Sequence, residues 1–110
     1  MIHALPAFHA GRATLEFWNN SPETVTVSGA DALPNGFPNF TSIDFPVMKL
    51  EPGKRWTVDV TASLVRLMEA LQQSNVQIQI LLSLGPNVNS GKDSGRYKVG
   101  CRNGHLTEFQ

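Results

Sequence analysis

The chain has 110 residues, of which 41% are hydrophobic and 16% are charged, and its formal net charge is zero. A chain of this length can bury one core without disulfide or metal support, so we expect a single domain over residues 1–110. The neutral charge balance argues against a nucleic-acid or membrane-surface protein. The single cysteine, Cys101, excludes an intrachain disulfide.

The first residues, up to Gly11 and Arg12, contain Pro6 and two histidines, and we predict an irregular arm over residues 1–12. His3 and His9 in such an arm would be solvated and would not form a metal pair. The segment lacks the basic start and long apolar run of a signal peptide, and no window approaches the roughly 18 apolar residues of a membrane span. The cellular compartment is therefore left open, and no membrane is expected as a partner.

Apolar and polar residues alternate over Ala13–Trp18 and again over Thr24–Ser28, which predicts two strands. The residues between them have turn-forming side chains, so a β-hairpin is expected. Trp18 has the outward parity of its strand and precedes Asn19 and Asn20. An exposed indole beside amides is typical of a sugar-binding surface, so these three residues are candidate glycan contacts. Burial at a sheet edge or at a subunit contact is the equal alternative.

Residues 29–42 are rich in Gly, Pro and Asn, which predicts a long loop. Such loops on a compact scaffold often carry binding sites. Phe37 and Phe40 lie in this loop and are either plugs that fill the core or contact residues for a partner, and the first reading is favoured. The following Ile43–Leu50 is a predicted strand that Pro46 interrupts, which places it at a sheet edge or a bulge.

The clearest pattern in the chain begins at Trp56, which alternates with Val58 and Val60 in the period of a half-buried strand and therefore points inward. A helix over about residues 62–74 follows, because apolar residues then recur at helical spacing. Those residues are Leu64, Leu67, Met68 and Leu71. Thr61 is the expected N-cap and Asn75 the expected stop.

After the helix the period returns to that of a strand, with five apolar residues on one face. They are Val76, Ile78, Ile80, Leu82 and Leu84. The apolar stripe of the helix is expected to cover the chain's own sheet, because the strands on both sides need a cover.

A polar, Gly-rich loop follows Leu84. Its segment Gly85–Asp93 lacks the spacing and the Ser or Thr of a phosphate-binding loop, so no nucleotide cofactor is expected. Arg96–Arg102 is the next predicted strand, and the turn residues Asn103 and Gly104 lead into a hairpin partner over 105–109. This hairpin places Cys101 opposite Leu106 with its thiol toward the core, which indicates an inert cysteine.

Arg96, Lys98 and Arg102 share the outward parity of this last strand and form a basic stripe. The stripe could meet phosphate groups or an acidic partner, although a solvated sheet face is the favoured reading. It has no interleaved aromatic residues, so nucleic acid is not the expected ligand. No motif for a metal, a cofactor or catalysis stands out, and no catalytic or metal residue is assigned.

Short strands with frequent turns and one helix predict a mainly β fold, an antiparallel β-sandwich of jelly-roll type with one inserted α-helix. An α+β open sheet with one covering helix is the alternative. The run Asp59-Val60-Thr61 after Trp56, with Leu64 and Leu67 beyond it, resembles the strand–helix–strand segment of jelly-roll modules, with Leu67 where those modules have an aromatic. This resemblance covers less than a third of the chain and implies a jelly roll.

For function, the low charge and the lack of catalytic motifs favour a non-catalytic module or structural subunit that acts by protein–protein contact or self-association. Such a subunit could belong to a larger assembly, for example a virion or a surface complex. The alternative is a carbohydrate-binding module that uses Trp18 and its neighbouring Asn residues. A small enzyme of unknown class is the second alternative.

Overall fold

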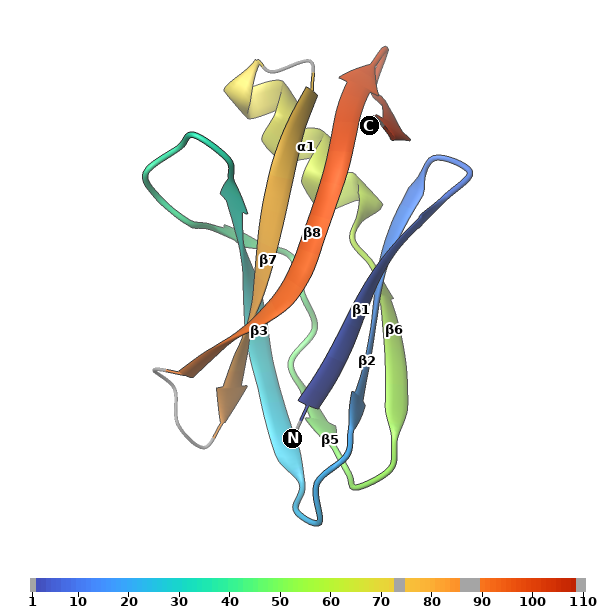
Figure 1. Cartoon of the computed structure of the whole chain (residues 1–110), viewed down its shortest axis with the longest axis vertical. Helices are drawn as coiled ribbons and strands as arrows, with labels where there is room; N and C mark the ends of the chain where they lie inside the picture. The colour runs from blue at the N-terminus through green and yellow to red at the C-terminus, as the bar shows by residue number, and fades with distance from the viewer. Residues whose placement is uncertain (1, 73–74, 86–89, 109–110) are drawn as a thin grey trace.

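The computed structural model describes residues 2–72, 75–85 and 90–108, and within them the fold is mainly β with one helix, as the sequence predicts (Figure 1). In chain order the elements are β1 (Ile2–His9), β2 (Arg12–Asn19), β3 (Val25–Pro34), β4 (Thr41–Ile43), β5 (Met48–Leu50), β6 (Arg55–Asp59), α1 (Thr61–Leu71), β7 (Asn75–Gly85), β8 (Ser90–Arg102) and β9 (His105–Glu108).

The strands divide into two antiparallel sheets. The smaller sheet has three strands in the order β1-β2-β6. The larger has six strands in the order β4-β3-β7-β8-β9, and β5 joins β3 on the same edge as β4. The alternative of one open sheet is therefore wrong.

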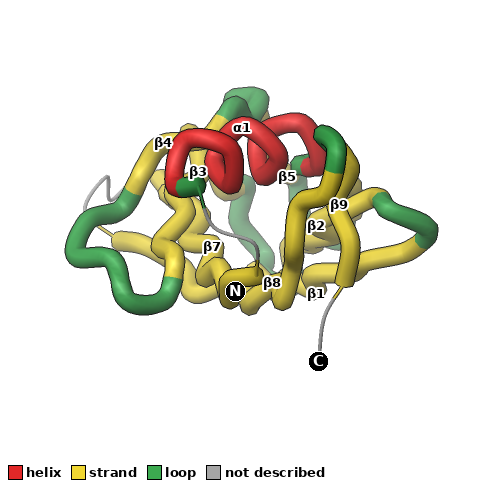
Figure 2. The backbone as a smooth tube through the Cα atoms, turned by 90° about the horizontal axis from the view of Figure 1, so that it is seen from above, coloured by secondary structure: helices red, strands yellow, loops and turns green. Residues whose placement is uncertain are grey.

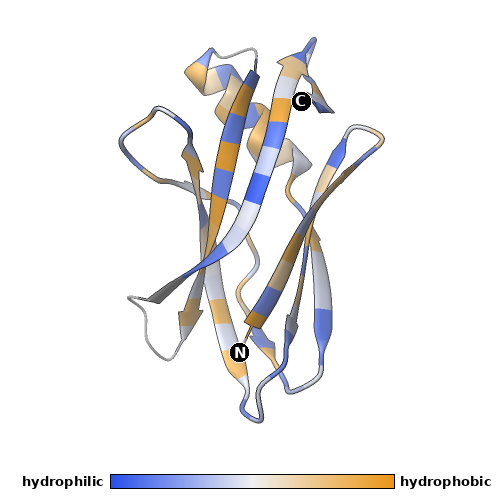
Figure 3. Ribbon diagram, viewed as in Figure 1, coloured by the Kyte–Doolittle hydropathy of each residue, from blue (hydrophilic) through white to orange (hydrophobic). Residues whose placement is uncertain are grey.

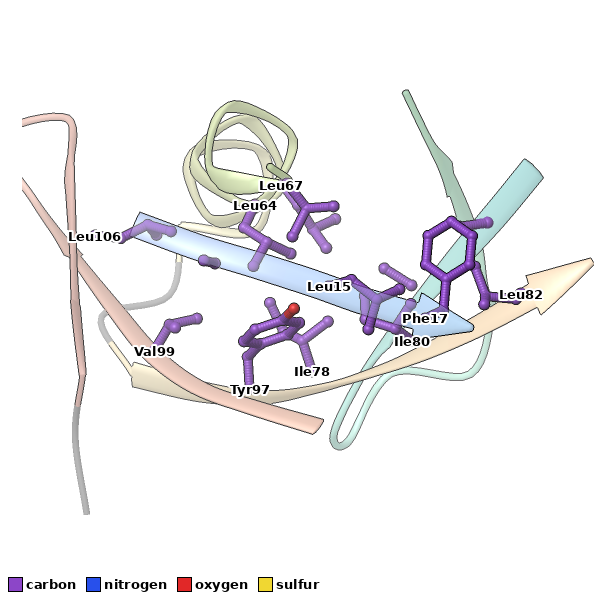
Figure 4. Packing of buried hydrophobic residues seen from close by; sticks show 14 of the residues in the cluster. Leu15, Phe17, Leu64, Leu67, Ile78, Ile80, Leu82, Tyr97, Val99 and Leu106 are labelled. Atoms are coloured by element: carbon purple, nitrogen blue, oxygen red, sulfur yellow. The ribbon is translucent and has the colours of Figure 1, made fainter. Parts of the chain in front are cut away.

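The helix α1 lies over the two sheets (Figure 2). The buried hydrophobic residues of the described chain form one core between the sheets and beneath this helix. Leu64 and Leu67 point from the helix into the space between the sheets, where Leu15, Ile78 and Tyr97 meet them (Figure 4). The predicted role of the helix as a cover for the chain's own strands is confirmed, because its apolar stripe is buried in this core.

The helix is shorter than predicted, and its ends differ from those expected. Thr61 is its first residue and not its N-cap, because the Thr61 hydroxyl accepts a hydrogen bond of 2.9 Å from the backbone N–H of Ala13. Val60 holds the N-cap position without a side-chain bond. At the other end Gln72 adopts the left-handed conformation with φ 57°, so the stop comes before Asn75, which begins β7.

The predicted irregular arm over residues 1–12 is wrong. Ile2–His9 forms β1 and pairs with β2 along its whole length, through a tight turn at Ala10 and Gly11 in which both residues have positive φ. Apolar Leu5 and Ala7 on the outward face obscure the alternation in the sequence. Pro6 is tolerated because β1 lies at an edge of its sheet.

The predicted hairpin between Ala13–Trp18 and Thr24–Ser28 is also wrong. The first segment lies in β2 and pairs with β1 and β6, whereas the second lies largely in β3, in the other sheet. The connection between them crosses from one sheet to the other (Figure 1).

The strand β7 shows the predicted alternation clearly (Figure 3). Val76, Ile78, Ile80 and Leu82 are all buried. Its neighbour β8 begins at Ser90, inside the segment expected to be a loop, and residues 86–89 lie outside the described part of the chain.

The hairpin of β8 and β9 is confirmed. Its turn residues Asn103 and Gly104 have positive φ, and Cys101 pairs with Leu106. The Cys101 side chain is half-buried against the core. Pro46 interrupts the edge next to β3, as predicted, and separates β4 from β5.

Candidate interaction surface

Trp18 lies on the outer face of the three-stranded sheet, as its parity predicts, but its ring is not free. His3 of β1 stacks on it with a centroid distance of 5.4 Å and an interplanar angle of 15°. The Arg55 guanidinium of β6 lies over the ring, 4.6 Å from its centroid. These neighbours come from the strands on either side of β2, so a sugar could stack on the indole only by displacing one of them.

Asn19 is fully buried, and its place among the predicted glycan contacts is wrong. Its amide donates to the carbonyl oxygens of Glu23 at 2.6 Å and of Leu50 at 2.8 Å. Its side-chain oxygen accepts from the backbone N–H and the hydroxyl of Ser21. Asn19 therefore ties β2 to the connection before β3 and to β5 of the other sheet, whereas its neighbour Asn20 is exposed.

Phe40 does not plug the core, because its side chain is 49% exposed. The favoured reading of this residue is therefore wrong. Phe37 is half-exposed and lines a surface hollow together with Gln77, Gln79 and Arg96. The structure thus brings two predicted contact residues, Phe37 and Arg96, to one place from distant parts of the chain.

The predicted basic stripe is exposed on the outer face of the six-stranded sheet. Arg96 lies 3.7 Å from the carboxylate of Asp93, so its charge is partly compensated, while Lys98 and Arg102 have no ion-pair partner among the described residues. Because Trp18 lies on the outer face of the other sheet, the structure does not combine the stripe and Trp18 into one site.

No three side chains of His, Cys, Asp or Glu gather as metal ligands within the part of the chain that the structure describes. Tyr97 is buried, and desolvation raises the pKa of its phenol far above the usual value, although a backbone hydrogen bond from Ala7 offsets part of this rise. The Tyr97 hydroxyl donates to the carbonyl oxygen of Thr14 and so links the two sheets. No described helix has the length and apolar content to span a membrane.

Asp59 ends β6 and fixes the start of α1. Its carboxylate accepts a 2.9 Å hydrogen bond from the backbone N–H of Thr61 and pairs with Arg12 of β2. Partial burial alone would raise the pKa of Asp59, but the bonds from Thr61 and Arg12 outweigh it and hold the pKa below its ordinary 3.8. The charged carboxylate is therefore the form that the fold favours.

Asp59→Asn should lower stability at neutral pH by at most about 1 kcal/mol, because the amide keeps an acceptor for Thr61 but loses the ion pair with Arg12. The pKa of Asp59 is lower in the folded protein than in the unfolded chain, so its ionised carboxylate stabilises the fold at pH values above the unfolded pKa. This contribution is lost as the pH falls below 3.8. Melting curves of both proteins at low concentration should therefore converge in acid. A difference that stays constant from neutral pH to pH values well below the ordinary pKa would contradict this assignment.

Sheet edges are the places where a β protein can pair with another chain, and three of the four edges formed by the described strands are protected. On β1, Pro6 lacks an N–H, and its ring lies against Gly95 of β8. The edge made by β4 and β5 is broken at Pro46. The third protected edge, β9, has only four residues and lies against α1.

The edge strand β6 has no such protection. Val60 donates to the carbonyl of Ala13 at 2.9 Å, and Asn19 donates to that of Lys54 at 3.1 Å. Both bonds belong to the same register between β6 and β2, so Val60 and Lys54 are positions that bond to β2. In an antiparallel ladder every second residue of a strand bonds to the same neighbour. The backbone groups of Trp56 and Val58 consequently face β2.

The same alternation directs the backbone N–H and C=O groups of Arg55, Thr57 and Asp59 away from the sheet. No described strand lies on that side of β6, which is at the margin of the molecule (Figure 1). A row of unpaired donors and acceptors on an exposed strand is a template for pairing with another strand.

Trp56 makes this edge partly apolar. Trp56 lies opposite Phe17 of β2 in the register of the sheet. The Phe17 ring is buried and contacts Phe45 at a centroid distance of 5.7 Å, so Trp56 is on the inner face of the sheet, as its parity predicts. The predicted burial is wrong, because β6 is an edge strand and the Trp56 side chain is 53% exposed. The sequence alone placed Trp56 in the core and therefore missed this surface.

The comparisons with known proteins do not name a function. No protein family matches the chain, and no curated protein matches it either. A crystal structure of a protein from Archaeoglobus fulgidus is similar over 99% of this chain and 94% of that chain, with 12% sequence identity and a TM-score of 0.38. A TM-score of 0.38 is too low to support a conclusion about fold or function.

Proposed function

We propose that this protein is a non-catalytic module that acts by protein–protein contact, and that β6 is its docking edge. The observation that carries the proposal is the unprotected edge of β6, where the backbone groups of Arg55, Thr57 and Asp59 have no strand partner within the described residues. An added strand would bond to these groups, and the exposed face of Trp56 would supply an apolar anchor.

Two features of β6 support docking over simple solvation. Its two charged side chains do not project freely as edge-blocking charges, because Arg55 pairs with Glu16 at 2.8 Å and Asp59 pairs with Arg12 within the same sheet. Its sequence, Arg-Trp-Thr-Val-Asp, contains no Pro or Gly and has the aromatic and β-branched residues that favour strands.

Carbohydrate binding at Trp18 has weaker support. Both the His3 ring and the Arg55 guanidinium already lie against the indole, and Asn19 is buried. A sugar site there would need a free ring face and accessible amides, of which only Asn20 is available as the structure stands.

Thr57→Pro is the variant that tests the docking edge. It removes an outward N–H without removing a bond to β2, so the monomer should keep its melting temperature, whereas Val58→Pro would break the ladder. We expect association with protein partners, including self-association, to weaken at least about tenfold, because an added strand loses a hydrogen bond and meets the proline ring.

The matched control is Thr57→Val, which keeps the N–H and the strand preference and should associate like the wild type. Light scattering reports self-association, and immobilised wild-type and variant proteins report binding of other partners. Equal association of the wild type and Thr57→Pro would rule out the proposed docking edge.

A further inference from the structure

We infer that the partner at this edge is a second copy of the same chain, paired antiparallel through β6; this inference rests on the proposed docking function of β6. The observation behind it is that β6 is complementary to itself. In antiparallel pairing about a two-fold axis at Thr57, each residue of β6 meets a chemically matched residue of the other copy.

On the outer face of the sheet, Arg55 of one copy would lie opposite Asp59 of the other, and the symmetry repeats this pair. Within each copy Arg55 already pairs with Glu16, and Asp59 with Arg12. Across the joined sheets the charges would therefore alternate in the order Arg12 and Asp59 of one copy, then Arg55 and Glu16 of the other. Opposite charges on directly facing strand positions stabilise the pairing, while like charges would oppose it.

The inner face and the centre of the strand match as well. Trp56 of one copy would lie opposite Val58 of the other, which is a favourable aromatic and β-branched pair and would cover the half-exposed indole. Thr57 would face its own symmetry mate, and the outward backbone groups described above would bond to each other in register.

A partner of unrelated sequence would need an acid opposite Arg55 and a base opposite Asp59 on one strand, at the same spacing. A second copy meets both conditions through symmetry alone. The position of β6 at the margin of the molecule leaves room for the body of a second copy (Figure 1).

The dimer should be weak and reversible. A strand of five residues buries less area than the about 1,200–2,000 Å² of stable interfaces, so dissociation is expected on dilution. Measurements must therefore cover a wide range of protein concentration.

Cross-linking tests the register. Thr57→Cys in a Cys101→Ser background places two thiols on facing, hydrogen-bonded positions, where the Cα atoms are about 5.5 Å apart and within disulfide reach. We expect a covalent dimer under mild oxidation. Thr107→Cys in the same background, also an exposed strand threonine but on β9, should stay monomeric.

Charge reversal tests the pairing chemistry. Arg55→Glu and Asp59→Lys should each weaken the homodimer at least tenfold, because each places like charges opposite one another across the two-fold axis. An equimolar mixture of the two should recover association as a mixed dimer. Melting curves show whether Asp59→Lys folds without its bond to Thr61, and the cysteine variant tests the same geometry without touching either charge.

The outcomes separate the two proposals. A wild type that stays monomeric at every concentration and forms no Thr57→Cys dimer overturns the second-copy inference. If another protein then binds the wild type and fails to bind Thr57→Pro, the docking edge stands without self-pairing. If that binding survives Thr57→Pro, both proposals fail. Selective cross-linking at Thr57, with rescue in the mixture of charge variants, supports both.

Discussion

Ile80→Lys should abolish the cooperative folding of this protein. Ile80 is fully buried in β7, with Ala32 of β3 as its register partner. A lysine there loses the packing of the isoleucine and carries an ammonium group without an acidic partner into the core, at a cost of several kcal/mol. This is comparable with the about 5–15 kcal/mol by which a native domain is stable.

The control for this variant lies one position away. Gln79→Glu puts a charge on the outer, half-exposed face of β7, opposite Arg96 of β8, and should change stability by no more than about 1 kcal/mol. Circular dichroism melts of both proteins check the pair. An Ile80→Lys protein that melts at the wild-type temperature would show that the faces of β7 are assigned the wrong way round.

Asn19→Ala should destabilise the protein by about 1–3 kcal/mol, since it removes the side-chain partner of one buried and two part-buried backbone groups. The carbonyls of Glu23 and Leu50 lose the amide donor, and the N–H of Ser21 loses its acceptor. These groups belong to two separate segments, the connection before β3 and the strand β5, so the two sheets lose a shared link at this end of the molecule.

Asn20→Ala is the matched control, because Asn20 is exposed and should tolerate the change within about 0.5 kcal/mol. Urea unfolding of the two variants measures the difference. Equal losses in both would mean that the Asn19 amide does not make the bonds that tie the sheets together.

The strand–helix–strand unit and the last hairpin could be predicted because their signals are local. The periods of β6, α1 and β7 lie within short windows, and the Asn103-Gly104 turn directs the chain back by its own conformational preference. Residues next to each other in the sequence settle these features.

The choice of strand partners could not be predicted, because it depends on residues far apart in the chain. β2 pairs with β1 and β6, and nothing near Trp18 distinguishes that arrangement from a hairpin with β3. The burial of Asn19 has the same origin, since its hydrogen-bond partners come from segments that only the fold brings together.

The candidate site could be predicted only in part. Trp18, Asn20, Phe40 and the basic stripe lie at the surface, but they are spread over separate faces. The edge at β6 was missed because alternation shows the face that a side chain points to and does not show whether a strand has a neighbour. One signal was present: a short strand that begins with Arg55, ends with Asp59 and has Thr57 at its centre.

Amide hydrogen exchange along β6 is the most direct test that this edge is where the protein pairs. In dilute protein, the amides of Trp56 and Val58 should be protected by β2, while those of Arg55, Thr57 and Asp59 should exchange freely. As the concentration rises, these three should become protected together, and Thr57→Pro should remove that protection at Arg55 and Asp59. Exchange at Arg55, Thr57 and Asp59 that stays independent of concentration would contradict the account.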